Sequence, residues 1–67
     1  MSKFADSQIE KLLRDAGADR VSADAIAKFN EILTEKALQI GRYAVDIARH
    51  DGRKTIKADD IKLSSQR

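Results

Sequence analysis

Apolar residues recur every three or four positions along most of this chain, which is the period of an amphipathic helix. The first stripe of this kind consists of Ile9, Leu12, Leu13 and Ala16. Ser7 lies three positions before Glu10, which is the spacing of a capping box at a helix start. Gly17 follows the stripe, where a left-handed residue commonly ends a helix. We therefore predict a helix from Ser7 to Ala16.

The longest apolar stripe begins after Ser22, which is a favourable N-cap residue, and continues to Arg49. Its members are Ile26, Phe29, Leu33, Ala37, Ile40, Ala44 and Ile47. Arg49 and His50 favour the negative end of a helix, and Gly52 allows the chain to leave it. We predict one continuous helix from Ser22 to Arg49.

This middle helix is too long for a compact domain of the same chain. A helix of about 28 residues rises about 42 Å at 1.5 Å per residue. A compact globule of 67 residues has a diameter of only roughly 28 Å. We therefore expect a second chain to cover the ends of the middle helix.

A third, shorter helix is predicted from Lys57 to Ser64. Its apolar side consists of Ala58, Ile61 and Leu63. Asp59 and Asp60 occupy its first turn, where the helix dipole favours acids. No segment has the pattern of a strand long enough to build a sheet, and the sequence contains no repeat or linker. We predict a single all-α domain over residues 1–67.

The composition of the chain mainly excludes several kinds of site and several classes of protein. The chain has no Cys and one His, so disulfides and thiolate or imidazole metal sites are excluded, and we expect neither a metal nor another cofactor. No apolar run approaches the roughly 18 residues that span a membrane, and the N-terminus lacks a signal-peptide core. So small a chain has little room for a substrate pocket, so we expect no catalytic residues, no enzyme activity and no small-molecule substrate. Small chains without disulfides or metals often gain stability by association, which favours an oligomer.

Two loop sequences give the chain a family resemblance. Residues 15–22 (DAGADRVS) resemble the first-loop signature of archaeal-type histones. Residues 48–61 (ARHDGRKTIKADDI) are similar to the second-loop signature of the same family almost residue for residue. Together the two signatures cover about a third of the chain. The order of a short, a long and a short helix matches the histone fold as well.

The resemblance implies a histone fold that forms an antiparallel handshake dimer and binds double-stranded DNA. The dimer would consist of two copies of this chain or of this chain and a paralogue. It would bend and wrap DNA with little sequence specificity, and dimer–dimer assembly on DNA would compact it into nucleosome-like or extended particles. The resemblance further implies a cytoplasmic protein that is associated with the chromosome.

The resemblance also implies which residues contact DNA. Arg20, in the first loop, is expected to enter the minor groove, and Ser22 is expected to help present helix N–H groups to phosphate. Lys54 and Thr55, in the second loop, are expected to contact phosphate or to steady Arg20. The predicted DNA-binding set is completed by Lys11, Arg14 and Lys57.

Two structural roles concern the second loop and the residues around it. We interpret Arg53 and Asp60 as an internal ion pair that holds the third helix against this loop. The resemblance implies that Ile47, Leu63, His50 and Asp60 form a contact between neighbouring dimers, with His50 paired to Asp60 of the neighbour. On the residues alone, His50 simply interacts favourably with the negative C-terminal end of the helix dipole.

Two other functions stay open on the sequence. A subunit that pairs with another histone-fold chain in a transcription-regulatory complex, with little DNA binding of its own, fits the low net charge of +2. A helical RNA-binding dimer is a more remote alternative, because it would carry its basic groups along helix faces rather than in loops. The chain also departs from the archaeal family in having no Pro near its start and a short end to its third helix.

Overall fold

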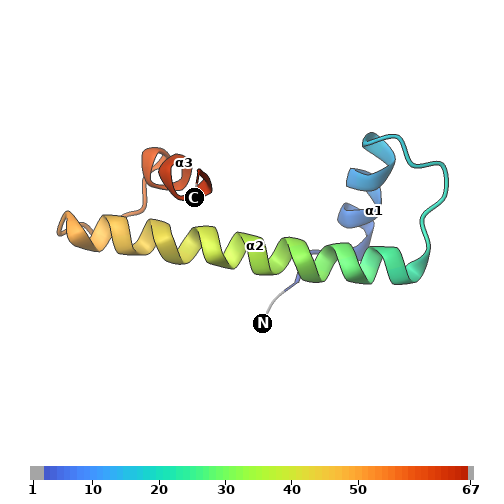
Figure 1. Cartoon of the computed structure of the whole chain (residues 1–67), viewed down its shortest axis with the longest axis horizontal. Helices are drawn as coiled ribbons and strands as arrows, with labels where there is room; N and C mark the ends of the chain where they lie inside the picture. The colour runs from blue at the N-terminus through green and yellow to red at the C-terminus, as the bar shows by residue number, and fades with distance from the viewer. Residues whose placement is uncertain (1–2, 67) are drawn as a thin grey trace. The chain divides into compact units, whose positions relative to one another are not determined.

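The computed structural model describes residues 3–66, so residues 1, 2 and 67 of the predicted domain lie outside the described part. Three helices follow one another in the order short, long, short (Figure 1). They are α1 at Asp6–Asp15, α2 at Ala23–His50 and α3 at Ala58–Ser65. No strand occurs among residues 3–66. The predicted all-α architecture with a long middle helix is confirmed.

The long helix α2 has the 28 residues that its apolar stripe predicts, shifted by one position. Ser22 directly precedes it, and the Ser22 hydroxyl oxygen accepts a hydrogen bond from the N–H of Ala25 at 3.1 Å. This bond satisfies one of the free N–H groups of the first turn, so the predicted N-cap is confirmed. The basic residues Arg49 and His50 lie in the last turn, where the helix dipole favours them.

The start of α1 differs from the prediction. The N-cap is Ala5, in an extended conformation, so the capping box predicted for Ser7 and Glu10 is wrong. Gln8 makes the contact that reaches back to the cap, because its side-chain oxygen accepts the N–H of Ala5 at 3.3 Å. The start of α1 differs because the segment before it contacts α2, and rules based on neighbouring residues cannot predict such a contact.

That contact is a clip formed by Asn30 and Thr34 of α2 with the main chain of Phe4, which we call the Asn30 clip. The amide oxygen of Asn30 accepts the N–H of Phe4 at 3.2 Å, and the amide nitrogen of Asn30 donates to the carbonyl of Phe4 at 2.8 Å. The hydroxyl of Thr34 donates to the same amide oxygen at 3.2 Å. Asn30 and Thr34 are both buried. The clip fixes the main chain at Phe4 and thereby sets the position at which α1 begins.

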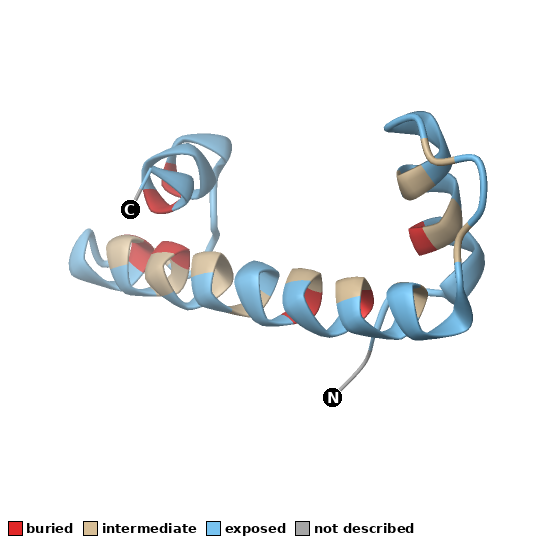
Figure 2. Cartoon of the chain, turned by 45° about the vertical axis from the view of Figure 1, so that its right-hand side comes forward, coloured by how far each residue is buried: buried red, intermediate tan, exposed pale blue. Residues whose placement is uncertain are grey.

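The chain divides into two compact units, Met1–Glu35 and Lys36–Arg67, and α2 contributes to both. In the first unit, α1 lies beside the N-terminal half of α2, and Ile9 of α1 is fully buried (Figure 2). In the second unit, α3 lies beside the C-terminal half of α2, and Ala44 and Ala48 of α2 are buried. Each unit thus has a small core of its own along part of the long helix.

The side of α3 that is buried in the single chain is polar. Asp60 and Ser64 are its buried residues. The predicted apolar side, Ala58, Ile61 and Leu63, is exposed in the single chain. Burial of the polar side is possible because each group has a partner: the hydroxyl of Ser64 donates to the carbonyl of Asp60 at 2.7 Å, and both oxygens of the Asp60 carboxylate accept hydrogen bonds.

Large apolar side chains remain uncovered over the described part of the chain. They are Phe4, Leu12, Ile32, Ile56, Ile61 and Leu63, each at least 42% exposed. The buried apolar residues are Ile9, Ala44 and Ala48, of which only one has a large side chain. A chain of this length buries too little apolar surface on its own to be more than marginally stable.

Candidate nucleic-acid interface

The first connection, residues 16–22, leaves α1 through a left-handed turn. Gly17 has φ +113°, a conformation that strains any residue with a side chain. The N–H of Gly17 donates to the carbonyl of Arg14 at 2.9 Å, and the N–H of Ala18 donates to the carbonyl of Leu13 at 3.1 Å. These two bonds form a Schellman motif, so the helix stop predicted at Gly17 is confirmed.

Beyond this turn, the connection presents Arg20 to solvent. Arg20 is exposed, and no hydrogen bond or ion pair within residues 3–66 engages its side chain. It lies two positions before Ser22, the cap of α2. The first turn of a long helix carries free N–H groups and a partial positive charge. A free guanidinium and a helix N-terminus therefore follow one another along the chain, and both attract anions.

The second connection, residues 51–57, begins with the same type of turn. Gly52 has φ +69°, and its N–H donates to the carbonyl of Arg49 at 2.9 Å. The N–H of Arg53 donates to the carbonyl of Ala48 at 2.8 Å, which completes a second Schellman motif. Both connections thus leave their helices by a glycine turn that fixes the first residues of the loop.

Arg53 ties the second connection to α3. Its guanidinium donates to the two carboxylate oxygens of Asp60, each at 2.9 Å, and to the carboxylate of Asp51 at 3.2 Å. It also donates to the main-chain carbonyl of Thr55 at 3.0 Å. The ion pair that the sequence predicts between Arg53 and Asp60 is therefore present in the structure. A bidentate pair of this kind is geometrically specific, so it fixes the loop at Thr55 relative to the start of α3.

The electrostatics of this pair follow from its hydrogen bonds. The bonds from Arg53, with a further bond from the N–H of Lys57 at 2.8 Å, lower the pKa of Asp60 from 3.8 to about 2. The hydrogen bond to Asp60 raises the pKa of the Arg53 guanidinium in turn. The Asp60 side chain is only 4% exposed. Asp60 is thus a buried carboxylate that is kept ionised by its partners.

The other predicted contacts of the second connection face solvent. Lys54, Thr55 and Lys57 are all exposed. No hydrogen bond or ion pair engages the side chain of either lysine in the part of the chain that the structure describes. Lys57 also serves as the N-cap residue of α3, with an extended backbone. The second connection therefore carries two free cations near a helix N-terminus.

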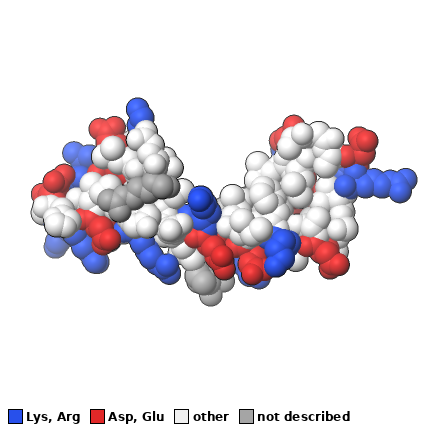
Figure 3. Space-filling model, viewed as in Figure 1, with Lys and Arg blue, Asp and Glu red and all other residues white. Residues whose placement is uncertain are grey.

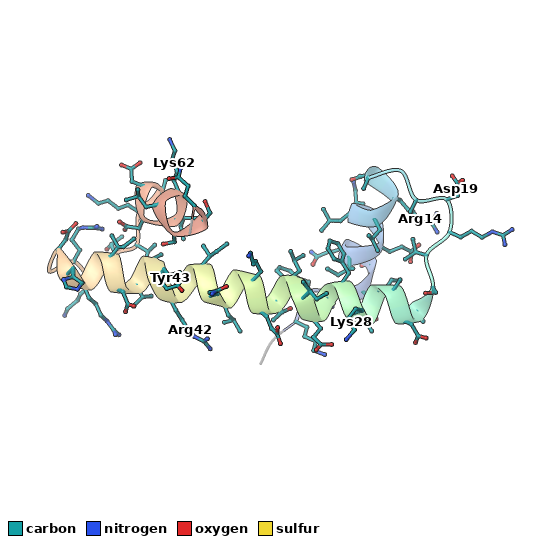
Figure 4. The ribbon with its side chains drawn as sticks, viewed as in Figure 1. Arg14, Asp19, Lys28, Arg42, Tyr43 and Lys62 are labelled. Carbon is teal, nitrogen blue, oxygen red and sulfur yellow. The ribbon has the colours of Figure 1, made fainter. Side chains whose placement is uncertain are left out.

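The two predicted cations of α1 are already paired with acids one helical turn away. Lys11 Nζ lies 3.0 Å from the carboxylate of Asp15, and Arg14 Nε lies 2.9 Å from the carboxylate of Glu10. Arg14 also donates to the main-chain carbonyl of Asp19 at 3.2 Å, and its side chain lies toward that residue in Figure 4. These acids lower the positive charge that α1 presents to an anionic partner.

The residues predicted to join dimers all belong to the second unit. His50 and Leu63 are exposed, and Ile47 is half-buried. Asp60 differs from them, because its carboxylate is buried and bonded to Arg53. Within residues 3–66, no hydrogen bond or ion pair engages the side chain of His50, so the structure does not join it to Asp60 of the same chain.

Basic and acidic side chains are interspersed over the face shown in Figure 3. No group of three His, Cys, Asp or Glu side chains among residues 3–66 is placed to hold a metal ion. No described helix is both long enough and apolar enough to cross a membrane.

Sequence reasoning misses two features that shape the first unit. The Asn30 clip lies within the apolar stripe of α2, where its only signal is a pair of polar residues, Asn30 and Thr34, one turn apart. The bond from Arg14 to the carbonyl of Asp19 is also missed, because the sequence shows where charges lie and not where the main chain passes.

Comparison with known proteins places this geometry in a family. Residues 3–64 match the family of histone-like transcription factors (CBF/NF-Y) and archaeal histones. The chain is 45% identical over 64 residues to a subunit of archaeal histone HAN1 of Thermococcus zilligii, and 50% identical over 64 residues to probable archaeal histone 3 of Methanocaldococcus jannaschii. Each alignment covers 96% of both chains. With its three helices in the order of the histone fold, the chain belongs to the family of histone-like transcription factors (CBF/NF-Y) and archaeal histones.

Proposed function

We propose that this chain is a chromosome-associated histone that binds duplex DNA as a dimer, through its two connections. The observation that carries the proposal is that each connection presents exposed, unpaired cations next to the N-terminus of the helix that follows it. Arg20 and Lys54, in the two connections, are exposed and unpaired within the described residues, whereas Lys11 and Arg14 of α1 are paired with acids. The two archaeal relatives are named histones, which supports the same function.

The proposed dimer accounts for the uncovered apolar surface. The apolar side of α3 and several other large apolar side chains are exposed in the single chain. An antiparallel handshake of two chains crossed along α2 would cover most of them and both ends of that helix, and would leave Leu63 for the contact between neighbouring dimers. The partner is a second copy of this chain or a paralogue. Light scattering tests the proposal, and so does the concentration dependence of melting, since an obligate dimer melts at a higher temperature when it is more concentrated.

The proposed contacts with DNA are mainly contacts with phosphate. Lys54 and Lys57 would neutralise phosphates, the Thr55 hydroxyl would bond a phosphate oxygen, and the helix end capped by Ser22 would present its free N–H groups to another. Arg20 would enter the minor groove, where it responds to groove width more than to base identity. Affinity would then come mainly from the release of counterions, with little sequence specificity.

Neighbouring dimers are proposed to join through Ile47, Leu63, His50 and Asp60. Ile47 and Leu63 would form a small apolar centre, and His50 would donate to Asp60 of the neighbouring dimer. Asp60 Oδ2 already accepts bonds from Arg53 and from the N–H of Lys57, whereas Oδ1 accepts one bond from Arg53 and has a second lone pair for a further donor. Assembly of dimers along DNA would wrap and compact it into nucleosome-like or extended particles.

A DNA-binding experiment with matched arginine variants tests the proposal. If a dimer neutralises about eight phosphates, the logarithm of its affinity falls against the logarithm of salt concentration with a slope of roughly −7. Arg20→Ala is compared with Arg42→Ala, since Arg42 is also exposed and unpaired among the described residues but lies on α2, away from both connections (Figure 4). We expect Arg20→Ala to shorten the DNA lengths protected from nuclease, and Arg42→Ala to leave them unchanged. Equal protection by the two variants, or salt-independent binding, would contradict the proposal.

The low charge balance favours one alternative. With a net charge of +2 and paired cations on α1, the chain also fits a histone-fold subunit of a regulatory complex that binds little DNA by itself. The same experiment separates the two functions. A pure dimer that binds no duplex DNA at low salt, but that pairs with another histone-fold chain, would establish the alternative.

A further inference from the structure

We infer that Arg14 is a positioning residue for Arg20 and not itself a phosphate contact. The inference rests on the proposed DNA-binding function. Two side-chain contacts carry it: Arg14 Nη1 donates to the carbonyl of Asp19 at 3.2 Å, and Arg14 Nε donates to the carboxylate of Glu10 at 2.9 Å. The Arg14 side chain therefore holds the first connection at Asp19, and Glu10 fixes the direction of that side chain.

The carbonyl of Asp19 belongs to the peptide group whose nitrogen is that of Arg20. A peptide group is planar, so a bond that fixes the oxygen of this group also fixes the plane from which the Arg20 backbone continues. The guanidinium of Arg14 thus acts on the orientation of Arg20 through one rigid unit. Figure 4 shows the Arg14 side chain lying toward the loop at Asp19.

The middle of the first connection has no other such restraint. Its first residues are fixed by the glycine turn after α1, and its last residue, Ser22, caps α2. Between them, residues 19–21 make no other hydrogen bond with their main chain in the described part of the structure. Without Arg14, these residues would be held only by their ends, and a loop tethered only at its ends samples many conformations.

The charges around Arg14 are poorly arranged for binding phosphate. Residues 6–15 carry three acids, Asp6, Glu10 and Asp15, against two bases, Lys11 and Arg14. The Glu10 carboxylate would repel a phosphate that approached the guanidinium bound to it. Two of the five N–H donors of Arg14 already make hydrogen bonds within the protein, one to the carboxylate of Glu10 and one to the carbonyl of Asp19.

The second connection contains the same arrangement, which supports the interpretation independently. There, Arg53 donates to the main-chain carbonyl of Thr55 while the carboxylates of Asp60 and Asp51 hold its guanidinium. In each connection, an arginine fixed by acids donates to a loop carbonyl at or next to a proposed DNA-contacting residue. The free cations, Arg20 and Lys54, are separate residues in both cases.

A double-mutant cycle on DNA affinity tests the inference, with Lys11 as the matched control. Lys11 also lies on α1 and is paired with an acid one turn away, but it has no bond to the connection. We expect Arg14→Ala to weaken binding roughly fivefold in the parent and hardly at all when Arg20 is already Ala, because coupled residues are non-additive. The effect of Lys11→Ala should be the same in both backgrounds. Additive losses for Arg14→Ala and Arg20→Ala would overturn the inference.

Salt dependence and a conservative variant give a second readout. Removal of one phosphate contact from each protomer would reduce the magnitude of the salt slope by roughly 1.8, whereas removal of a positioning residue should leave the slope at its parent value. Arg14→Lys keeps the charge but cannot reproduce the planar fork that spans a carboxylate and a carbonyl. We therefore expect Arg14→Lys to weaken binding nearly as much as Arg14→Ala. Full affinity in Arg14→Lys would show that only the charge matters and would overturn the inference.

A measurement without DNA separates this inference from the proposed function. The backbone amide of Arg20 is followed by ¹⁵N relaxation in the free protein, with helix content checked by circular dichroism. We expect Arg14→Ala to increase the mobility of the Arg20 amide, and Lys11→Ala to leave it unchanged. An Arg20 amide that is equally ordered in both variants would refute the positioning role. Failure of the parent to bind DNA would refute the proposed function instead.

Discussion

The Asn30 clip gives a quantitative test of how the first unit is held together. The amide of Asn30 makes three hydrogen bonds, two with the main chain of Phe4 and one with the hydroxyl of Thr34. Asn30 is only 3% exposed, so its amide group is largely shielded from water, whereas Phe4 is exposed and its two bonds are partly buried. Asn30→Ala removes all three bonds without introducing a larger side chain.

The expected loss of stability is smaller than the sum of these bonds. Three hydrogen bonds contribute about 3 kcal/mol at a net value of about 1 kcal/mol each. Release of the segment at Phe4 lets its main chain bond water and regain conformational freedom, which offsets about 1 kcal/mol. Alanine also has the higher helix propensity, by roughly 0.5 kcal/mol. Thr34 keeps a partner, because a helical threonine hydroxyl can bond the carbonyl four residues before it. The remaining destabilisation is about 1.5 kcal/mol per chain.

Thermal and urea unfolding at equal protein concentration measure this loss. At roughly 4–8 °C per kcal/mol for a domain of this size, Asn30→Ala should lower Tm by about 6–12 °C. Gln39→Ala is the matched control, since it removes an exposed amide from the same helix that makes no side-chain hydrogen bond within residues 3–66. We expect the control to change stability by less than about 0.5 kcal/mol. Equal melting of the two variants would refute the reasoning, since it would mean that the clip adds nothing to the fold.

Three further predictions concern the ion pair between Arg53 and Asp60, the N-cap of α2 and the assembly of dimers. The pKa of Asp60 is lowered from 3.8 to about 2, so the stability that this group contributes is complete above about pH 4 and is lost as the pH falls to about 2. Asp60→Asn should therefore remove that part of the acid transition in thermal melts. An acid transition that is unchanged in the variant would contradict the assignment. Ser22→Ala should cost about 1 kcal/mol in urea unfolding because the N–H of Ala25 loses its acceptor, whereas Ser22→Thr should restore most of the loss. His50→Ala should leave Tm unchanged and shorten the longest DNA fragments protected from nuclease, because a weak contact between dimers matters only when DNA tethers them; identical fragments from both proteins would show that His50 only ends its helix.

The long helix is the element that the sequence predicts best. Its start, its end and its length all follow from signals within the helix or next to it, namely a serine cap, a regular apolar stripe and a glycine after the last turn. Each of these signals acts over one or two turns, so no distant part of the chain is needed to read them. The same holds for the glycine turns at Gly17 and Gly52, where the required backbone conformation selects the residue.

The two short helices show why other features do not follow from the sequence. The start of α1 depends on Asn30, which lies 26 positions away from Phe4, so a local capping rule selects the wrong residues. The inward side of α3 depends on a carboxylate whose charge is compensated by Arg53 from the preceding loop. A pattern of apolar positions cannot predict burial of a polar face, because that burial depends on partners that only the folded chain provides.

The net charge of the chain and the arrangement of its charges lead to different expectations for DNA binding. A net charge of +2 suggests weak attraction to DNA if every charge counts equally. In the structure, two of the three acids of α1 pair with Lys11 and Arg14, and two further acids pair with Arg53. Exposed charges more than about 10 Å apart are largely screened at 0.1 M salt. An acid therefore weakens the electric field of the cation to which it is hydrogen-bonded more than the field of a cation that lies far away. Arg20 and Lys54 have no carboxylate hydrogen-bonded to their side chains within the described residues, and Asp19, an exposed acid, directly precedes Arg20 in the chain. This arrangement supports the proposed contact with DNA through the connections, in which the position of Arg20 is expected to matter more than the number of basic residues on α1.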